Sequence, residues 1–253
     1  MTPREAELYA LTHCGNPGDR EFYARACEKA ASVLELGVGY GRLLPDLSRA
    51  ARSVVGLDSE PQLLKSARRA IAALPAAQQR RIRLVRGQMQ AFELGRRFER
   101  IVLPYNGLYC LLTQAALRAC FRCVRKHLTP GGDFLFDVWA ADRFHSQSDA
   151  SAHYDDEAPI LQLCRGAELW DVFESSHLRK RDQRLNVTYT YVTERRAPVS
   201  IGIAQRYARS RELFALLARA GFERVQAYGG FAGQRFGPRS EHLVVCARAP
   251  AAR

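Results

Sequence analysis

Val33-Leu34-Glu35-Leu36-Gly37-Val38-Gly39-Tyr40-Gly41-Arg42 is the stretch that decides the fold of this chain. A short apolar run leads into an acid and then into three alternating glycines. Glycine is needed where a backbone turns sharply or must approach a ligand without a Cβ in between. A second apolar run follows and ends in Asp58. The order of strand, glycine loop, helix and acidic strand end predicts a nucleoside-binding half-sheet, with the acid placed for ribose hydroxyls.

The spacing of the glycines narrows the kind of ligand. Proteins that bind nicotinamide dinucleotides use G-x-G-x-x-G, which would need a glycine where this chain has Arg42. Glu35 also sits close to the expected ligand, where a carboxylate would repel a pyrophosphate but attract an ammonium group. The residues therefore indicate a nucleoside that carries a cationic amino-acid tail, and S-adenosylmethionine fits that description.

With these residues in place, the chain resembles the class I S-adenosylmethionine-dependent methyltransferases over most of its length. Residues 35–41 match the first motif of that family, and Gly56-Leu57-Asp58 matches its second-strand acid. Residues 85–89 match the third-strand motif, except that Gln88 replaces the customary Asp that meets the adenine amino group. A Gln carbonyl can still accept from that amine. Later stretches resemble the fourth-strand motif, the turn into the fifth strand and the late helix, at residues 98–106, 128–136 and 210–222.

The resemblance implies S-adenosyl-L-methionine as the cofactor, held by residues at the ends of the first four strands and by one N-terminal side chain. The expected contacts are Glu35, Gly37, Val38, Gly39, Gly41, Asp58, Ser59, Gln88, Met89, Leu103 and Tyr23.

The order of the predicted elements defines the fold class. Strands and helices alternate over residues 32–138, which calls for a parallel sheet with helices on both faces. The pattern changes after Trp139, where a polar stretch expected to be a loop or short helix precedes three strand-like runs at 168–173, 185–193 and 199–206. We expect an α/β, doubly wound, mostly parallel seven-stranded sheet with an antiparallel cap inserted between its fifth and sixth strands. The last two strands, 222–228 and 242–248, would pair as a hairpin.

We expect one methyltransferase domain over residues 1–253. It would divide into an N-terminal helical lid (1–30), a cofactor-binding core (31–138), a substrate-cap insertion (139–206) and a final helix and hairpin (207–253). Ligands of open parallel sheets lie beyond the carboxyl ends of the strands, so the inserted cap is well placed to cover the site.

Composition is consistent with a globular enzyme. The chain has 253 residues, of which 47% are hydrophobic and 25% charged, and no apolar run approaches the roughly 20 residues of a membrane span. Its seven cysteines have irregular spacing and do not indicate a disulfide framework. Cys120 and Cys123 lack a second pair of ligands, so structural cysteines are favoured over a zinc site and no metal is expected. A cytoplasmic location is the simplest prediction.

The formal charge of +12 raises the question of a nucleic-acid partner. All but four of the 38 basic residues are arginine, and they are scattered apart from a cluster at 179–181. Such a skew can come from genomic base composition, so a nucleic-acid partner is not favoured, although the charge keeps it open.

Residues that could face the methyl acceptor follow the fourth and fifth strands or lie outside the core. Leu103-Pro104-Tyr105-Asn106 lacks the leading polar residue and the second proline that DNA and protein-glutamine amino methyltransferases carry here. The candidates for catalysis are Tyr105, Asn106, His145 and His13, the last in a glycine-rich loop that could fold over the cofactor. The candidates for substrate binding are Tyr105, Asn106, Tyr109, Trp139, Tyr189 and Arg206. Tyr189 shares a strand face with Tyr191, and both could instead simply pack on the sheet.

These features predict methyl transfer to nitrogen or oxygen of a small molecule or short peptide, and we expect the reaction to belong to specialised metabolism. An RNA or protein methyltransferase is the nearest alternative, because of the positive charge. A non-catalytic scaffold that binds the cofactor and serves as a regulatory partner is an alternative of a different class. The sequence does not indicate the acceptor, the number of methyl groups or the oligomeric state.

Overall fold

A seven-stranded sheet forms the centre of the molecule in the computed structural model, which describes residues 1–165 and 168–252. Positions 166, 167 and 253 of the predicted cap and C-terminal ranges lie outside the described residues. The strand order is β11-β12-β5-β4-β1-β2-β3. The pairs among β1 to β5 are parallel, while β12 runs antiparallel to both β5 and β11. The strands are β1 (Val33–Leu36), β2 (Val54–Asp58), β3 (Ile82–Arg86), β4 (Phe98–Leu103), β5 (Leu128–Trp139), β11 (Arg224–Tyr228) and β12 (His242–Arg248). The predicted doubly wound sheet and its final hairpin are confirmed.

Helices cover both faces of this sheet because successive residues of a strand point to opposite sides. On one face, Leu34 and Phe136 pack into a cluster with α6 (Gln114–His127) and α8 (Ser210–Arg219). On the other face, Val33 packs with residues of helices that precede or follow the first two strands. These are α2 (Asp19–Ala26), α3 (Leu44–Ala50) and α4 (Pro61–Ala72), and the short α5 (Ala76–Gln79) follows α4.

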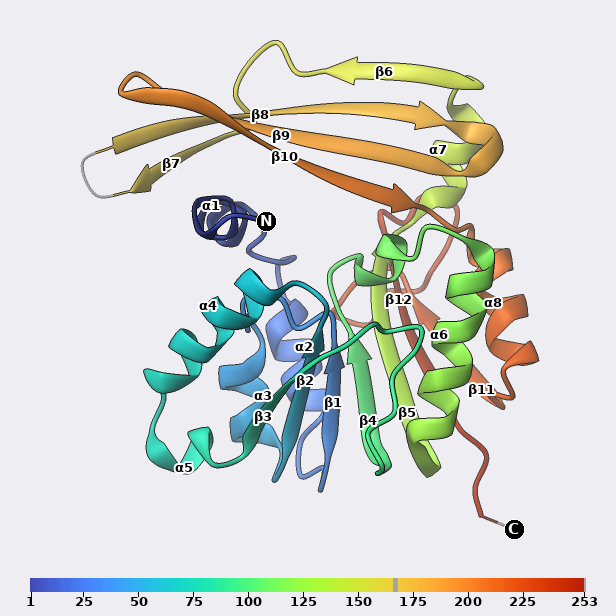
Figure 1. Ribbon diagram of the computed structural model, residues 1–253. Helices are drawn as coiled ribbons and strands as arrows, with labels where there is room; N and C mark the ends of the chain where they lie inside the picture. The colour runs from blue at the N-terminus through green and yellow to red at the C-terminus, as the bar shows by residue number, and fades with distance from the viewer. Residues whose placement is uncertain (166–167, 253) are drawn as a thin grey trace.

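A second, antiparallel sheet lies across the carboxyl ends of the parallel strands (Figure 1). Its order is β10-β9-β8-β6, and β7 also pairs with β8. We call residues 139–206 the cap. Its elements are α7 (Ala141–Gln147), β6 (Ser151–Asp155), β7 (Leu161–Arg165), β8 (Glu168–Arg179), the short helix η2 (Lys180–Asp182), β9 (Arg184–Thr193) and β10 (Arg196–Arg206). The three predicted strands are present, and the polar stretch before them forms α7 and the additional strand β6.

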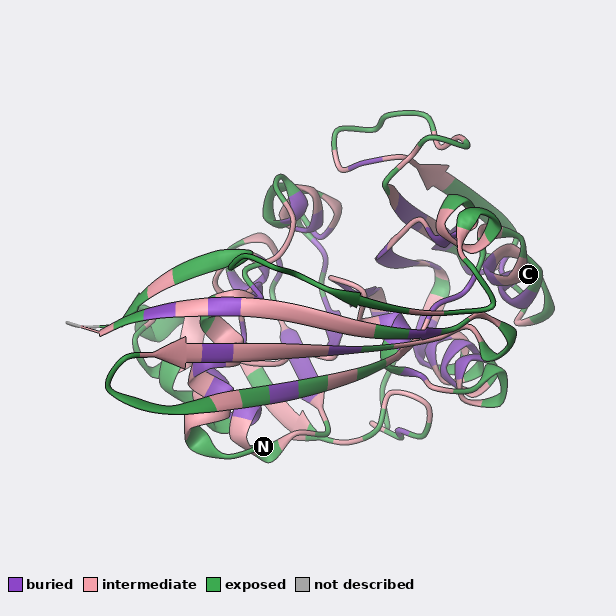
Figure 2. Cartoon of the chain, turned by 90° about the horizontal axis from the view of Figure 1, so that it is seen from above, coloured by how far each residue is buried: buried purple, intermediate pink, exposed green. Residues whose placement is uncertain are grey.

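The N-terminal helix α1 (Pro3–Thr12) lies between the cap and α4 (Figure 1). Leu8 packs there with Trp170, Tyr191 and Ile201 of the cap, and the Thr12 hydroxyl lies 2.8 Å from the Tyr191 hydroxyl. Seen from above, buried positions recur along the cap strands between exposed and half-buried ones (Figure 2). The inner face of the cap is therefore held to the core through α1.

None of the described helices combines the length and the apolar character that a membrane crossing would require.

Candidate active site

A cavity of about 210 Å³ opens at the carboxyl ends of β1, β2 and β4, beneath α1. The short helix η1 (Gly107–Cys110) follows β4 and contributes to its wall. The residues around the cavity are Tyr9, His13, Glu35, Gly37, Val38, Gly39, Tyr40, Arg42, Asp58, Ser59, Leu63, Met89, Pro104, Tyr105, Gly107 and Cys110. The wall thus combines the glycine loop predicted for the cofactor with residues from four other parts of the chain.

The glycine loop has a conformation that other residues adopt only with strain. Gly37, Gly39 and Gly41 all have positive φ, at 64°, 55° and 86°. At Gly41 space is short as well, because a Cβ would lie 3.0 Å from a methyl group of Leu44. Asp58 fixes the loop from the neighbouring strand, since its Oδ2 accepts from the Gly39 N–H at 2.8 Å. Its other oxygen accepts from the Glu60 N–H at 2.8 Å, so the carboxylate is held at the end of β2.

Glu35 is the most unusual group in the wall. Only 2% of the residue is exposed, and Oε2 is sealed from solvent without a hydrogen-bond partner among the described residues. Burial raises the pKa of this carboxyl to about 8, although the nearby Arg42 guanidinium acts in the opposite direction. Buried acceptors normally have donors, because an unpaired one loses its hydration without replacement. An ammonium group in the cavity would supply this missing donor, so the site fits the amino-acid end of S-adenosylmethionine.

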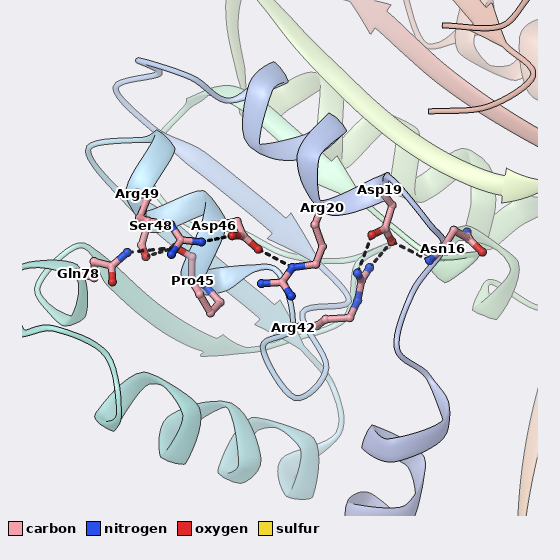
Figure 3. A network of polar contacts seen from close by, with 9 residues as sticks. All are labelled: Asn16, Asp19, Arg20, Arg42, Pro45, Asp46, Ser48, Arg49 and Gln78. Atoms are coloured by element: carbon pink, nitrogen blue, oxygen red, sulfur yellow. Dashed lines mark hydrogen bonds and ion pairs between the residues drawn. The ribbon is translucent and has the colours of Figure 1, made fainter. Parts of the chain in front are cut away.

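Arg42 ties the N-terminal segment to the glycine loop (Figure 3). Its guanidinium donates to both carboxylate oxygens of Asp19, at 2.8 and 2.6 Å, and Asp19 also accepts from the Asn16 N–H. Asp19 is almost fully buried. The chain passes so close that a Cβ on Gly15 would lie 2.2 Å from Arg42 Nη1. The residue that occupies the third glycine position of a dinucleotide fingerprint therefore has a structural task here.

Asp137, near the end of β5, forms a second junction beneath the cavity. Its buried carboxylate accepts from the Tyr23 hydroxyl at 2.6 Å and from the Tyr105 N–H at 2.9 Å. Asn16 donates to the other oxygen at 3.3 Å. Burial raises the pKa of Asp137 to about 6, while the bonds from Tyr23 and Tyr105 act against this rise. Asp137 thus holds the turn after β4 in register with the N-terminal segment.

Aromatic rings close the upper part of the cavity. The His13 imidazole stacks on Tyr9, with ring centroids 3.9 Å apart and an interplanar angle of 12°. Tyr105, from the turn after β4, and Tyr189, from the cap strand β9, meet the His13 ring edge-on at 6.2 and 5.0 Å. The Tyr40 hydroxyl donates to the His13 carbonyl oxygen at 3.0 Å. Three segments that are distant in sequence therefore converge on His13.

Most of the predicted cofactor residues come together at this cavity. Glu35, Gly37, Val38, Gly39, Asp58, Ser59 and Met89 line it. Gly41 and Leu103 support the wall from behind, because Gly41 packs towards Leu44 and Ala67, and Leu103 lies under Gly37 and Gly107. Gln88 does not line the cavity and forms an isolated β-bridge with Ala91.

Tyr23 requires a correction. It is fully buried among α2, α3 and the sheet, and its hydroxyl is used by Asp137. The predicted contact between Tyr23 and the cofactor is therefore replaced by a role in holding the N-terminal segment.

Some of the residues predicted to bind the acceptor line the cavity, and others do not. His13 and Tyr105 line the cavity, and Tyr189 contacts His13 from the cap. Asn106 does not line it, because its side-chain oxygen accepts from the Trp139 N–H at 2.7 Å.

Four further candidates are engaged elsewhere. Tyr109 is buried and donates to the carbonyl oxygens of Trp139 and Ala208. Trp139 packs on the rings of Tyr109, Phe144 and Tyr207. The Nδ1 atom of His145 lies 2.9 Å from the Tyr207 hydroxyl, and Arg206 forms an ion pair with Glu212 at 2.7 Å. These side chains hold the cap on the core and do not reach the cavity wall.

Several wall residues were not predicted, and each carries only a weak sequence signal. Tyr9 lies on the amphipathic helix α1, Tyr40 sits inside the glycine motif, and Cys110 belongs to η1. Asp137, which lies beneath the wall, was not predicted either, and it has the clearest signal because it is an acid in an otherwise apolar run at the carboxyl end of a parallel strand. Within the described ranges, no group of three or more His, Cys, Asp or Glu side chains is arranged to hold a metal ion.

Comparisons with known proteins agree with this geometry. Residues 33–132 match a family model described as a methyltransferase domain. A curated relative from Streptomyces fradiae, dTDP-3-amino-3,6-dideoxy-alpha-D-glucopyranose N,N-dimethyltransferase, is 32% identical over 142 residues, which cover 53% of this chain and 52% of the relative. Another, the dTDP-3-amino-3,4,6-trideoxy-alpha-D-glucopyranose N,N-dimethyltransferase of Streptomyces venezuelae, is 30% identical over 53% of this chain and 56% of its own. The chain thus spans about half the length of the curated relatives it matches.

A solved structure is similar over nearly the whole chain. The CcbJ methyltransferase from Streptomyces caelestis superposes with a TM-score of 0.79 at 27% identity, covering 94% of this chain and 98% of that one. The match includes the cap as well as the core, because so little of either chain is left out. These matches identify residues 33–132 as a methyltransferase domain. Together with the glycine loop, the acid that ends β2 and the sheet order, they support a class I S-adenosylmethionine-dependent methyltransferase.

Proposed function

We propose that this protein is an S-adenosylmethionine-dependent N-methyltransferase that acts on an amine of a small molecule, with an amino sugar as the preferred acceptor class. The observation that carries the proposal is the sealed Oε2 of Glu35, which has no hydrogen-bond partner in the part of the chain that the structure describes. Glu35 lies at the wall of a cavity that is also lined by Asp58 and the glycine loop. This arrangement supports a ligand with an ammonium group at one end and ribose hydroxyls at the other. The two curated relatives, both named as methyltransferases of 3-amino sugars, support the amine acceptor.

The residues divide the work of binding between them. Glu35 would accept from the amino group of the ligand, and the free lone pairs of Asp58 would accept from the ribose hydroxyls. Leu63 and Met89 supply apolar surface beside them. When bound, the cofactor supplies an activated methyl group on a sulfonium. The chain then needs mainly to position the acceptor and to exclude water.

The cap and α1 support this second task. They cover the carboxyl ends of the strands, and the rings of Tyr9, His13 and Tyr189 are packed together above the cavity. A cavity of about 210 Å³ is smaller than the roughly 300–1,000 Å³ usual for small-molecule sites, so we expect this cover to move when ligands enter. The predicted cytoplasmic location stays a prediction.

Calorimetry followed by product analysis tests the proposal. S-adenosylmethionine and S-adenosylhomocysteine should bind, and NAD should not. The protein is then incubated with S-adenosylmethionine and dTDP-3-amino-3,6-dideoxyglucose, and mass spectrometry identifies the products. The sugar with a 3-hydroxyl group in place of the amine is the matched control. Methylation of the amino sugar alone is the expected result. Cofactor binding without any product from a panel of amines would favour the non-catalytic scaffold, and NAD binding would contradict the cofactor.

A further inference from the structure

His13 is held in one orientation and one tautomer. It lies at the carboxyl end of α1, where its ring stacks on Tyr9 and its Nδ1 is 3.0 Å from the Tyr9 carbonyl oxygen. A carbonyl oxygen can only accept a hydrogen bond, so Nδ1 must carry the proton. In a neutral ring the remaining nitrogen, Nε2, then has a free lone pair.

The Nε2 atom of His13 is available to a ligand. It has no hydrogen-bond partner in residues 1–165 and 168–252, and it is not among the polar atoms sealed from solvent. The residue lines the cavity, with Tyr105 and Tyr189 edge-on to its ring. Burial lowers the pKa of His13 to about 4, against the bond to Tyr9 that acts to raise it. The cavity therefore presents a neutral hydrogen-bond acceptor beside the rings of Tyr9, Tyr105 and Tyr189.

His13 is poorly suited to act as a general base. Amino groups have ordinary pKa values of about 8 to 10, so transfer of a proton from an ammonium to His13 is disfavoured by roughly ten-thousandfold or more. Accepting a hydrogen bond from a neutral amine carries no such penalty. His13 is thus suited to orient an amine and unsuited to deprotonate one.

We propose that His13 is a positioning residue whose Nε2 accepts an N–H of the amine substrate and turns the nitrogen lone pair towards the methyl donor. The inference rests on the proposed function. In the reaction, the lone pair of R–NH₂ forms the new N–C bond while the C–S bond breaks and its electron pair stays on sulfur. The product R–NH₂⁺–CH₃ then loses a proton to solvent, and R–NH–CH₃ can enter a second cycle.

This arrangement sets a limit on the number of methyl groups. A primary amine and its monomethyl product both carry an N–H for Nε2 while keeping a lone pair for attack. A neutral tertiary amine has no N–H, and its protonated form has an N–H but no lone pair. The reaction should therefore stop at the dimethylamine and should not form a trimethylammonium product.

Two substitutions of His13 distinguish the contribution of its aromatic ring from that of its hydrogen-bond acceptor, Nε2. His13→Phe keeps a flat ring on Tyr9 but removes Nε2, and His13→Gln restores a carbonyl acceptor on a chain of similar reach. His153→Phe, on the exposed strand β6, is the matched control. Each variant is first checked for a wild-type thermal transition. Steady-state rates are then measured with dTDP-3-amino-3,6-dideoxyglucose and its N-methyl and N,N-dimethyl forms, at pH 6 to 9.

We expect kcat/KM of His13→Phe to fall by about ten- to a hundredfold for both the primary and the secondary amine, as a lost hydrogen bond to a substrate predicts. His13→Gln should recover part of this loss, and the pH profile should keep its wild-type shape. Rates of His13→Phe within twofold of wild type would overturn the inference. So would loss of one limb of the pH profile, or a trimethylammonium product from the wild-type enzyme. Wild-type protein that binds S-adenosylhomocysteine but methylates none of these amines would overturn the proposed acceptor and this inference together, whereas absence of cofactor binding would overturn the proposed function at its base.

Discussion

The cavity is lined by two groups of residues that are built in different ways, and we call them its cofactor end and its acceptor end. The end that we assign to the cofactor uses Glu35, Gly37, Gly39 and Asp58, which lie within 24 residues on two adjacent parallel strands and the loop that follows the first of them. The end that we assign to the acceptor uses His13, Tyr105 and Tyr189, which come from the N-terminal segment, the turn after β4 and the cap. A local strand–loop–strand unit specifies the first end almost alone. The second end exists only when three distant segments pack, so the two ends should respond differently to mutation.

The largest expected effect is on stability, at the ion pair between Arg42 and Asp19 that connects the glycine loop to the N-terminal segment. Asp19→Ala removes the partner of Arg42, whose side chain is 12% exposed while that of Asp19 is 2% exposed. Breaking a buried ion pair leaves an uncompensated charge and costs about 3–5 kcal/mol of unfolding free energy. Urea unfolding measures this loss. Asp46→Ala is the matched control, because Asp46 pairs with the exposed Arg20 and Arg49, and such pairs contribute about 0–1 kcal/mol. Equal losses in both variants would show that the N-terminal segment is not fastened through Asp19.

Glu35 tests the cofactor end directly. Glu35→Gln keeps the shape of the side chain but cannot carry a charge. Loss of one partner of a buried charge pair should weaken S-adenosylhomocysteine binding by about 2–5 kcal/mol, roughly thirtyfold to several thousandfold. Calorimetry gives the dissociation constant. The ligand-free variant should keep the wild-type melting temperature near pH 7, since Glu35 is mostly protonated there. An unchanged affinity in Glu35→Gln would remove the ammonium from this position.

Asp58 should have a smaller effect. A carboxylate that accepts from ribose hydroxyls makes charge-assisted hydrogen bonds worth about 1.5–3 kcal/mol. Asp58→Ala should therefore weaken cofactor binding by roughly ten- to a hundredfold. The variant also loses the bond to the Gly39 N–H, so circular dichroism must first show a native fold. A folded Asp58→Ala protein with wild-type affinity would leave the acid with a role in the loop alone.

The effect of a change by one pH unit is the smallest, and it belongs to the cofactor end only. Burial raises the pKa of Glu35 to about 8 in the ligand-free protein, so the group holds a proton at neutral pH. An ammonium ligand favours the ionised form, and binding below pH 8 must release that proton. Affinity should rise by up to tenfold per pH unit from pH 6 to pH 8 and then level off. Calorimetry in two buffers with different ionisation enthalpies measures the released proton. A slope that persists in Glu35→Gln would assign the proton to another group.

The same contrast explains which predictions from the sequence succeeded. The family, the seven-stranded sheet and the cap strands are confirmed, because hydrophobic alternation and glycine spacing are local signals. Tyr23 and Tyr109, which were assigned to ligands, do not line the cavity, and one shared reason accounts for both. Each is a large aromatic side chain near the site, and packing turned its hydroxyl to a buried partner, Asp137 for Tyr23 and two backbone carbonyls for Tyr109. Sequence position placed both near the cavity but could not give the direction in which each side chain points.

Taken by itself, the sequence determined the cofactor end, since Glu35, the three glycines and Asp58 lie on one short unit whose geometry follows from strand register and backbone sterics. Tertiary structure alone decided the other end. It placed Tyr9 and His13 under the cap, brought Tyr189 to His13, and left Nε2 of His13 unpaired within the described chain. It also directed the Asn106, Trp139, His145 and Arg206 side chains to other partners. The physical reason is that a side chain's burial, and with it its protonation and its free hydrogen-bonding atoms, is set by contacts between segments far apart in the chain, which no local pattern encodes.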